Sequence, residues 1–456
     1  MVSKLLVDEI AAVVRKDNLI VELDNITSYM KELGVVADSY PRLIVYVENE
    51  SQVSAIVRIA AANGLGIIPR GSGRSLAARS INVADTLILD LRKMNRIVEI
   101  DDKNLTVTIQ PGVLLADLKK SLEEKNLYLP PDVDTLEPVT MGGILAANAG
   151  GLRMLKYGSF VDYVMGIRLV TATGEVFTTG KKAIKDVAGY NLAKFLVGSR
   201  GTLGIITEAL LKVLPFPRKR SLLVASFTAI QDMIDTSSGI ISRKLTPSMM
   251  QFLDVAAVNL STKQAPFRIP PNTSLLFLIE ADGYPSAVDD DLSICRDVCR
   301  EKNAIDIVLL DDTAAIGKMI DMRKGLLSDI LQTSPGAIVF EIVSPRNRIP
   351  EIVAATSSAV VAPDSIVSFG HAAAGSFYLV FLFKDTGDEN RTRICNTVEE
   401  IIKGVKKAGG DWEILSAQGI KTSDVPACAI PRQDIEVVNN LKHALDPQNI
   451  FNPGRS

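Results

Sequence analysis

Two glycine-rich loops in the first half of the chain restrict its fold more than any other feature of the sequence. The first occupies residues 70–75 (RGSGRS) and follows a strand-like run, and the second occupies residues 141–151 (MGGILAANAGG). Small residues in loops that follow strands let backbone N–H groups approach a pyrophosphate closely, whereas a larger side chain would block that approach. Taken alone, either loop could equally be an ordinary turn.

Neither loop matches the common nucleotide-binding fingerprints. The sequence contains no GxxxxGK[ST], which excludes a P-loop. The first loop also lacks the matching helix and the ribose-binding acid that accompany GxGxxG in a Rossmann fold. A ligand bound by these loops therefore needs a site of another type.

Bulk properties narrow the class of protein further. The formal net charge of −3 provides no general field that would attract nucleic acid or an anionic membrane surface. The longest apolar runs, such as FYLVFLF at 377–383, are too short for a transmembrane segment, and charges interrupt the N-terminal stretch where a signal peptide would be apolar. The four cysteines show neither a disulfide framework nor iron–sulfur spacing, so we expect a reducing, cytoplasmic setting.

At 456 residues the chain is expected to form two or three domains. Residues 1–37 are typical of a helical lead-in, and strand-like and helical runs follow over residues 38–217. Within that part, GIRLVTATGEVFTT predicts a hairpin. Residues 218–425 mix helices and strands, and residues 426–456 predict a helix followed by an extended tail.

Three motifs in this order resemble one known family. RGSGRSL, the stretch PPDVDTLEPVTMGGILAANAGGLRMLKYGSF and GSRGTLGIITEALLKVLP are similar to the FAD-binding domain of the vanillyl-alcohol oxidase/p-cresol methylhydroxylase superfamily. Within it, they most resemble the D-lactate and glycolate dehydrogenase branch, which includes the FAD subunit of glycolate oxidase. The resemblance implies an α+β fold with a two-subdomain FAD-binding domain at 38–217, an α+β substrate (cap) domain at 218–425, and a C-terminal segment at 426–456 that returns to the FAD site.

The same resemblance implies which residues hold FAD. The first loop would wrap the pyrophosphate, the second would line the flavin and its phosphates, the GSRGTLGII motif would lie near the ribose and adenine, and the terminal NPG would return to the flavin. The implied residues are Arg70, Gly71, Ser72, Gly73, Arg74, Ser75, Pro131, Asp132, Thr140, Gly142, Gly143, Ala146, Asn148, Gly151, Gly201, Gly204, Ile205, Ile206 and Asn452.

Two features modify this expectation. Arg200 stands where the family usually has Glu in GSEGTLG, so the resemblance implies no acid-dependent contact at that position. The chain has only two histidines, His371 and His443, and no cysteine precedes Cys295, so the FAD-binding domain lacks the residues that relatives use for covalent attachment. Non-covalent FAD is therefore expected.

The substrate half departs further from the family. The usual metal-binding HxGDGNxH reads HAAAGSFY here, so His371 remains while Ala374 and Tyr378 replace the acid and the second histidine. The later EHG reads Ala417-Gln418-Gly419. Because a zinc site needs three or four converging ligands, no metal is expected.

Three interpretations of His371 remain open: a surviving catalytic base, a structural histidine, or a ligand of an altered metal site. Tyr378 is a candidate proton carrier, although an unperturbed phenol is a weak base near neutral pH. Arg323 falls where the family places an arginine near the substrate carboxylate, and a bidentate clamp would suit that place. It could equally be a solvated helix residue.

The resemblance implies an FAD-dependent oxidoreductase subunit that transfers hydride from a small 2-hydroxyacid to FAD and passes electrons to an iron–sulfur or other acceptor. An iron–sulfur electron-transfer subunit is the expected partner, and peripheral membrane association through a partner is compatible with this. The alternative is an FAD-binding electron-transfer or scaffold subunit that has lost substrate oxidation.

Overall fold

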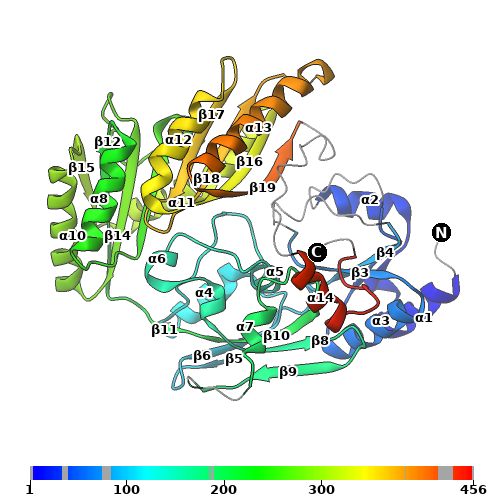
Figure 1. Ribbon diagram of the computed structural model, residues 1–456. Coiled ribbons are helices and arrows are strands. Elements are labelled where there is room, and N and C mark those ends of the chain that lie inside the picture. The colour runs from blue at the N-terminus through cyan, green and yellow to red at the C-terminus, as the bar shows by residue number, and fades with distance from the viewer. Residues whose placement is uncertain are drawn as a thin grey trace.

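The computed structural model describes residues 4–32, 40–73, 84–183, 185, 189–385, 387–419 and 435–453. Figure 1 shows an α+β protein in which the N-terminal half lies below a large sheet formed by the later part of the chain. The C-terminal helix, in red, returns to the N-terminal half. The predicted FAD contacts Arg74 and Ser75 lie outside the described residues.

The N-terminal half begins with a four-stranded sheet that helices cover. Its strands, in the order β1-β2-β4-β3, are β1 (Leu19–Ile20), β2 (Leu43–Tyr46), β4 (Thr86–Asp90) and β3 (Gly66–Arg70). Its helices are α1 (Lys4–Val14), α2 (Leu23–Glu32) and α3 (Glu50–Ala62). The segment expected to be a helical lead-in thus also contains a strand, since β1 pairs antiparallel with β2.

A second, antiparallel sheet completes the N-terminal half. Its strands, in the order β5-β6-β10-β8-β9, are β5 (Ile97–Asp101), β6 (Thr106–Ile109), β10 (Ile205–Lys212), β8 (Val164–Val170) and β9 (Val176–Gly180). A small ladder joins β7 (Leu127–Tyr128) to β11 (Leu214–Pro215). The helices here are α4 (Leu115–Glu123), α5 (Met141–Ala147), α6 (Met154–Tyr157) and α7 (Leu192–Leu196). The predicted hairpin is confirmed as β8–β9, with Gly174 at a positive φ of 74° in its turn.

The later part of the chain forms an eight-stranded antiparallel sheet. In spatial order its strands are β15 (Asp306–Leu310), β12 (Lys219–Phe227), β14 (Leu275–Gly283), β13 (Met249–Asp254), β17 (Ser365–His371), β18 (Ser376–Phe383), β16 (Gly336–Val343) and β19 (Asp411–Gln418). One face packs against α8 (Ile230–Ser242), α10 (Pro285–Glu301), α12 (Ile349–Ser358) and α13 (Arg391–Lys407). The other face packs against α9 (Val255–Val258) and α11 (Thr313–Thr333), and beyond them it faces the N-terminal half.

The C-terminal segment is built into the N-terminal half. After α14 (Ile435–Leu445), Phe451 forms a parallel bridge with Ile67 of β3, and the Asn452 N–H donates to the Ile67 carbonyl at 2.8 Å. Phe451 is fully buried in the core of the four-stranded sheet. The tail therefore acts as an added edge to that sheet.

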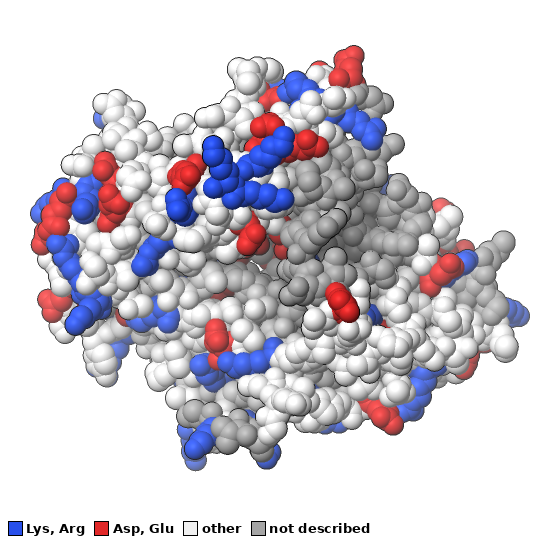
Figure 2. Space-filling view, in the orientation of Figure 1, with Lys and Arg blue, Asp and Glu red and all other residues white. Residues whose placement is uncertain are grey.

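Charges of both signs are interspersed over the face shown in Figure 2. This agrees with the small net charge of −3. Within the part of the chain that the structure describes, no helix is long and apolar enough to span a membrane.

Candidate functional site

A glycine-lined cavity lies where the two sheets of the N-terminal half meet. It lies between the end of β3, the N-terminal part of α5 and the start of β10. The residues lining it are Pro69, Arg70, Gly71, Leu91, Pro111, Gly142, Gly143, Ala146, Ser199, Arg200, Gly201, Gly204, Ile205 and Ile206. Three motifs that are far apart in the sequence thus meet around one space.

The glycines are required because other groups occupy the places where their side chains would be. A Cβ at Gly142 would lie 2.6 Å from Pro111, and a Cβ at Gly204 would lie 2.3 Å from Leu169. Gly143 differs, since among the described residues outside its own helix backbone only the Thr140 hydroxyl, at 3.3 Å, lies within 4 Å of its Cβ position. Backbone therefore forms much of the wall, which suits a flat ligand with phosphates.

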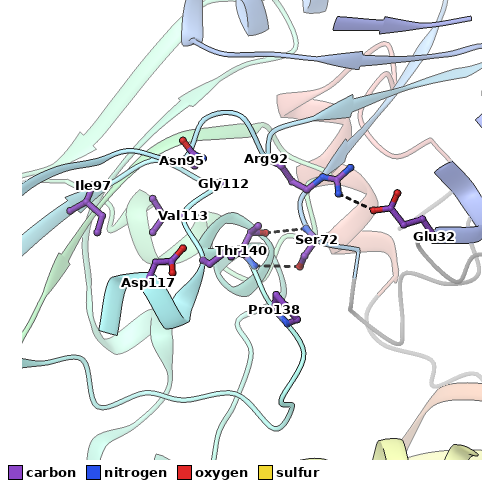
Figure 3. Close-up of a pocket in the computed structure, with 11 residues that line it drawn as sticks. Glu32, Ser72, Arg92, Asn95, Ile97, Gly112, Val113, Asp117, Pro138 and Thr140 are labelled. Carbon is purple, nitrogen blue, oxygen red and sulfur yellow. Dashed lines mark hydrogen bonds and ion pairs between the residues drawn. The ribbon is translucent and has the colours of Figure 1, made fainter. Parts of the chain in front are cut away.

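The two glycine-rich loops are tied together by a reciprocal pair of hydrogen bonds. The Ser72 N–H donates to Thr140 Oγ1, and the Thr140 N–H donates to Ser72 Oγ, both at 3.3 Å (Figure 3). These two residues line a second cavity of about 340 Å³, at whose rim Arg92 pairs with Glu32 at 3.4 Å. Gly73, at a φ of 70°, continues the first loop.

The C-terminal tail reaches the wall of the glycine-lined cavity. Asn452 Nδ2 donates to the carbonyls of Arg200 at 2.8 Å and Gly201 at 3.2 Å. Its Oδ1 atom is buried and has no hydrogen-bond partner among the described residues. An amide held in this way has an acceptor available for a ligand.

The remaining predicted cofactor residues do not line this cavity. Asn148, at a φ of 46°, ends α5 and accepts a hydrogen bond from the Val161 N–H at 3.2 Å. Gly151 packs directly against the backbone of Asp132. A Cβ at residue 151 would lie only 1.8 Å from the Asp132 carbonyl oxygen. Pro131 is buried beside them.

Asp132 is buried within a cluster of cations. Its carboxylate lies 2.7 Å from Lys119 of α4, 2.7 Å from Lys324 of α11 and 3.5 Å from Arg153. Burial alone would raise the pKa of Asp132, but these three cations outweigh it and hold the pKa well below its usual range. The side chain of Asp132 therefore joins the N-terminal half to α11.

A second buried ion pair crosses between the same two parts. The Arg153 guanidinium contacts both carboxylate oxygens of Glu280 on β14, at 2.6 and 2.8 Å. Close by, Lys156 binds Asp282 at 2.7 Å. Burial would raise the pKa of Glu280, but Arg153 and then Arg220 lower it by more.

Polar side chains gather on the sheet face that looks toward the N-terminal half. In an antiparallel ladder, directly opposed residues lie on one face. The register opposes Gln251 of β13 to His371 of β17, and Tyr378 of β18 to Glu341 of β16. Gln251 Nε2 also reaches the carbonyl of Leu152 at 3.5 Å, which places this polar face against the second loop.

Arg323 connects this face to the PPDVDTLEP stretch, which precedes the second loop. Its Nε donates to Gln251 Oε1 at 3.1 Å, its Nη2 contacts Asp134 Oδ2 at 2.8 Å, and its guanidinium lies 5.0 Å from the centre of the Phe369 ring. Only 1% of the side chain is exposed, so Arg323 is not a solvated helix residue.

The three residues predicted to be catalytic therefore lie in one cluster. His371 is buried, and its Nδ1 lies 2.7 Å from Gln251 Nε2. Burial lowers the pKa of His371 to about 4. Burial, together with the negative charges of Asp134 and Glu341, raises the pKa of Tyr378.

Two members of the cluster, Asp134 and Gln251, were not among the predicted site residues. A signal was present for each, because Asp134 lies within the PPDVDTLEP stretch and Gln251 is the single amide in the strand MMQFLD. Gln418, which replaces a family histidine, instead donates to the carbonyls of Leu331 and Ser334 at 3.1 and 2.9 Å. It therefore secures the end of α11.

Arg200, the departure from the family motif, binds Glu413 of β19 at 2.9 Å. The altered position thus links the N-terminal half to the edge of the large sheet. Within the described ranges, no group of three or more His, Cys, Asp or Glu side chains is placed to hold a metal ion.

Comparison with known proteins agrees with this architecture. Residues 41–180 match the FAD binding domain family, and residues 216–456 match the C-terminal domain of FAD linked oxidases. The chain is 33% identical over 420 residues to glycolate oxidase subunit GlcD of Bacillus subtilis, covering 91% of this chain and 89% of the relative. It is 29% identical to D-lactate dehydrogenase of Anaerostipes hadrus, covering 93% and 91% of the two chains.

A solved structure of p-cresol methylhydroxylase with substrate bound has the same fold. The TM-score is 0.75 at 18% identity, and the match covers 99% of this chain and 96% of that one. The predicted α+β fold of the vanillyl-alcohol oxidase type is thereby confirmed.

Proposed function

This chain belongs to the family of FAD-linked oxidases, and we propose that it oxidises a small 2-hydroxyacid of the D-lactate or glycolate type. Electrons would pass from its FAD to a separate acceptor, for which an iron–sulfur subunit in the cytoplasm is our candidate. The names of the relatives support this substrate class, since they include a glycolate oxidase subunit and a D-lactate dehydrogenase.

The glycine-lined cavity is the observation that carries the proposal. It brings together predicted cofactor residues from all three motifs, including Gly71, Gly143 and Gly204. The buried Oδ1 of Asn452 offers an acceptor at the same wall. The residues present therefore fit FAD, which when bound supplies an acceptor for hydride.

We propose that FAD is held without a covalent bond. The described part of the chain contains Cys295 and Cys299, which are buried in α10, and Cys395, which lies in α13. Both helices pack against the face of the large sheet that looks away from the N-terminal half. The purified protein should show an oxidised-flavin spectrum, and acid or heat should release all of the flavin into the supernatant. Flavin that remains with the denatured polypeptide would contradict this proposal.

Anaerobic mixing with a panel of 2-hydroxyacids tests the function. At least one small D-2-hydroxyacid should bleach the flavin absorbance, and chelators should not prevent it. The second candidate is an electron-transfer subunit without substrate chemistry. One observation favours it: Arg323, the residue expected to bind the substrate carboxylate, already pairs with Asp134. In that case no acid will bleach the flavin, whereas an artificial reductant still will.

A single methyl group tests the cofactor site. Gly143→Ala places a methyl group on the cavity wall while improving the helix propensity of α5. The thermal stability of the flavin-free protein should change little, because only the Thr140 hydroxyl, 3.3 Å from the new Cβ, has to shift. We expect FAD affinity to fall by about tenfold or more, or about 1.4 kcal/mol. Fluorescence titration of released and rebound FAD measures this.

Gly317→Ala in α11 is the matched control, because no atom lies within 4 Å of its Cβ position. It should leave FAD affinity unchanged. Equal affinity in Gly143→Ala and wild type would show that the cavity is not the cofactor site.

A further inference from the structure

The cluster around His371 contains a hydrogen-bond chain whose direction chemistry fixes. It runs from Asp134 through Arg323 and Gln251 to His371. An arginine can only donate hydrogen bonds, and a glutamine amide has one accepting and one donating end. The role of each atom in the chain therefore follows from its neighbours.

Gln251 can be oriented in only one way. Its Oε1 end faces Arg323 Nε at 3.1 Å, so this end must be the acceptor. Its Nε2 end faces the Leu152 carbonyl at 3.5 Å and His371 Nδ1 at 2.7 Å. Because the carbonyl is an acceptor, this end must be the donor, and the amide N–H therefore donates to His371 Nδ1.

The tautomer of His371 follows from that orientation. A neutral imidazole that accepts at Nδ1 must carry its hydrogen on Nε2. Nε2 makes no hydrogen bond within the part of the chain that the structure describes. The atom that His371 offers to a ligand is therefore a donor. Burial, which lowers the pKa of His371 to about 4, keeps the ring neutral at pH 7.

A ring fixed in this state cannot take a proton at Nε2, so a proton acceptor must lie elsewhere. Asp134 has the required features. Its Oδ2 pairs with Arg323, and besides burial a hydrogen bond between the Tyr378 hydroxyl and this carboxylate helps to raise the pKa of Tyr378. Its Oδ1 is buried without a hydrogen-bond partner among the described residues. Only 11% of the side chain is exposed, and Asp134 belongs to the loop that carries the implied flavin contacts Pro131 and Asp132.

We propose that Gln251 fixes His371 as the Nε2–H tautomer, which donates to the substrate carboxylate, and that Asp134 Oδ1 accepts the proton of the substrate hydroxyl. This rests on the proposed 2-hydroxyacid oxidation. The substrate C–H bond breaks with its electron pair passing as hydride to FAD, the oxidant, while the O–H bond breaks with its proton passing to Asp134. A carbon–oxygen double bond forms, and the product is a 2-oxoacid.

Nitrogen NMR tests the tautomer without any turnover. In the flavin-loaded full chain labelled with ¹⁵N-histidine, only two imidazoles give signals, and a His443→Gln variant assigns them. We expect Nε2 of His371 to be protonated and Nδ1 to be bare. Gln251→Glu, which exchanges the donor for an acceptor, should move the proton to Nδ1. A wild-type ring with its proton on Nδ1 would overturn the His371 assignment.

Stopped-flow reduction of the flavin tests the proton acceptor. Asp134→Asn keeps an oxygen for Arg323 but removes the base, so the limiting reduction rate should fall by about 10²–10⁴-fold with a nearly unchanged dissociation constant for the acid. Formate should restore part of the rate in Asp134→Gly. Glu341→Gln changes the half-buried carboxylate opposite Tyr378 and should alter the rate by less than about tenfold.

His371→Ala separates the two roles. Loss of a donor to a charged ligand should weaken acid binding by about 10–100-fold and change the limiting rate less. A fall of about 10²–10⁴-fold in the limiting rate would instead make His371 the base and overturn the proposal.

Tighter acid binding by Asp134→Asn without slower reduction would also overturn it, because Asp134 would then only compete with the acid for Arg323. If no acid reduces the wild-type flavin, the proposed function fails and the Asp134 role with it, while NMR still decides the tautomer.

Discussion

Glu280→Gln should lower the free energy of unfolding by about 3–5 kcal/mol, because it leaves Arg153 buried opposite a neutral partner. Arg153 and Glu280 are 6% and 0% exposed, so water cannot replace the lost charge. The pair also joins the N-terminal half to the large sheet, so the change should weaken the contact between these two parts. Denaturant unfolding of the flavin-loaded protein measures the loss.

The surface pair Arg243–Glu301 provides the control. Its side chains are 39% and 53% exposed, and the same change at Glu301 should cost no more than about 1 kcal/mol. Replacing Arg153 and Glu280 together with methionine should recover part of the loss, since Arg153 is then not left buried opposite a neutral partner; Arg220 still loses Glu280 as a neighbour at 3.8 Å. Equal stability of Glu280→Gln and Glu301→Gln would contradict a role for this pair in holding the two parts together.

Acidification should show the same dependence of stability on the buried ion pairs. The folded pKa values of Asp132 and Glu280 are depressed, so their stabilising contribution is full above the unfolded values near about 4. It is lost as pH falls below about 4. Wild-type stability should therefore drop steeply on acidification below that pH, and Glu280→Gln should drop less. Parallel curves for the two proteins would contradict this linkage.

The glycine-rich loops could be singled out from the sequence because close packing at these positions leaves no room for a side chain. Gly71, Gly142 and Gly204 stand where a Cβ would meet another atom at 2.0–2.6 Å, and such a requirement leaves glycine as a visible mark in the sequence. The tail was likewise predicted to return to the FAD site, and in the structure Phe451 of the tail forms a bridge with Ile67 of β3.

The polar face around His371 was harder to predict because it depends on strand register. Gln251 and His371 are far apart in the sequence and meet only because β13 and β17 pair. Glu280 lies in the strand LLFLIEADG, where the sequence alone does not indicate which cation pairs with it. A lone polar residue in a buried strand indicates a paired group, but the pairing itself arises from tertiary structure.

Deleting residues 447–456 should remove most of the bound FAD and destabilise the N-terminal half by at least about 3–5 kcal/mol, the usual cost of losing a buried phenylalanine. The deletion removes Phe451, which is fully buried. It also removes the backbone N–H groups of Ile450 and Phe451, which donate to the Asp446 carboxylate at 3.0 and 2.8 Å. It also removes Asn452 from the cavity wall.

Phe451→Ala distinguishes loss of fold from loss of the cofactor site. It removes the same buried ring but keeps Asn452, so a similar fall in stability should leave more FAD per folded molecule than the deletion does. The ratio of flavin to protein absorbance, measured below the unfolding transition of each variant, makes the comparison. Because Asn452 Nδ2 is held by the carbonyls of Arg200 and Gly201, its Oδ1 has a fixed position for a ligand. A deletion variant that keeps the wild-type flavin content would remove the tail from the cofactor site.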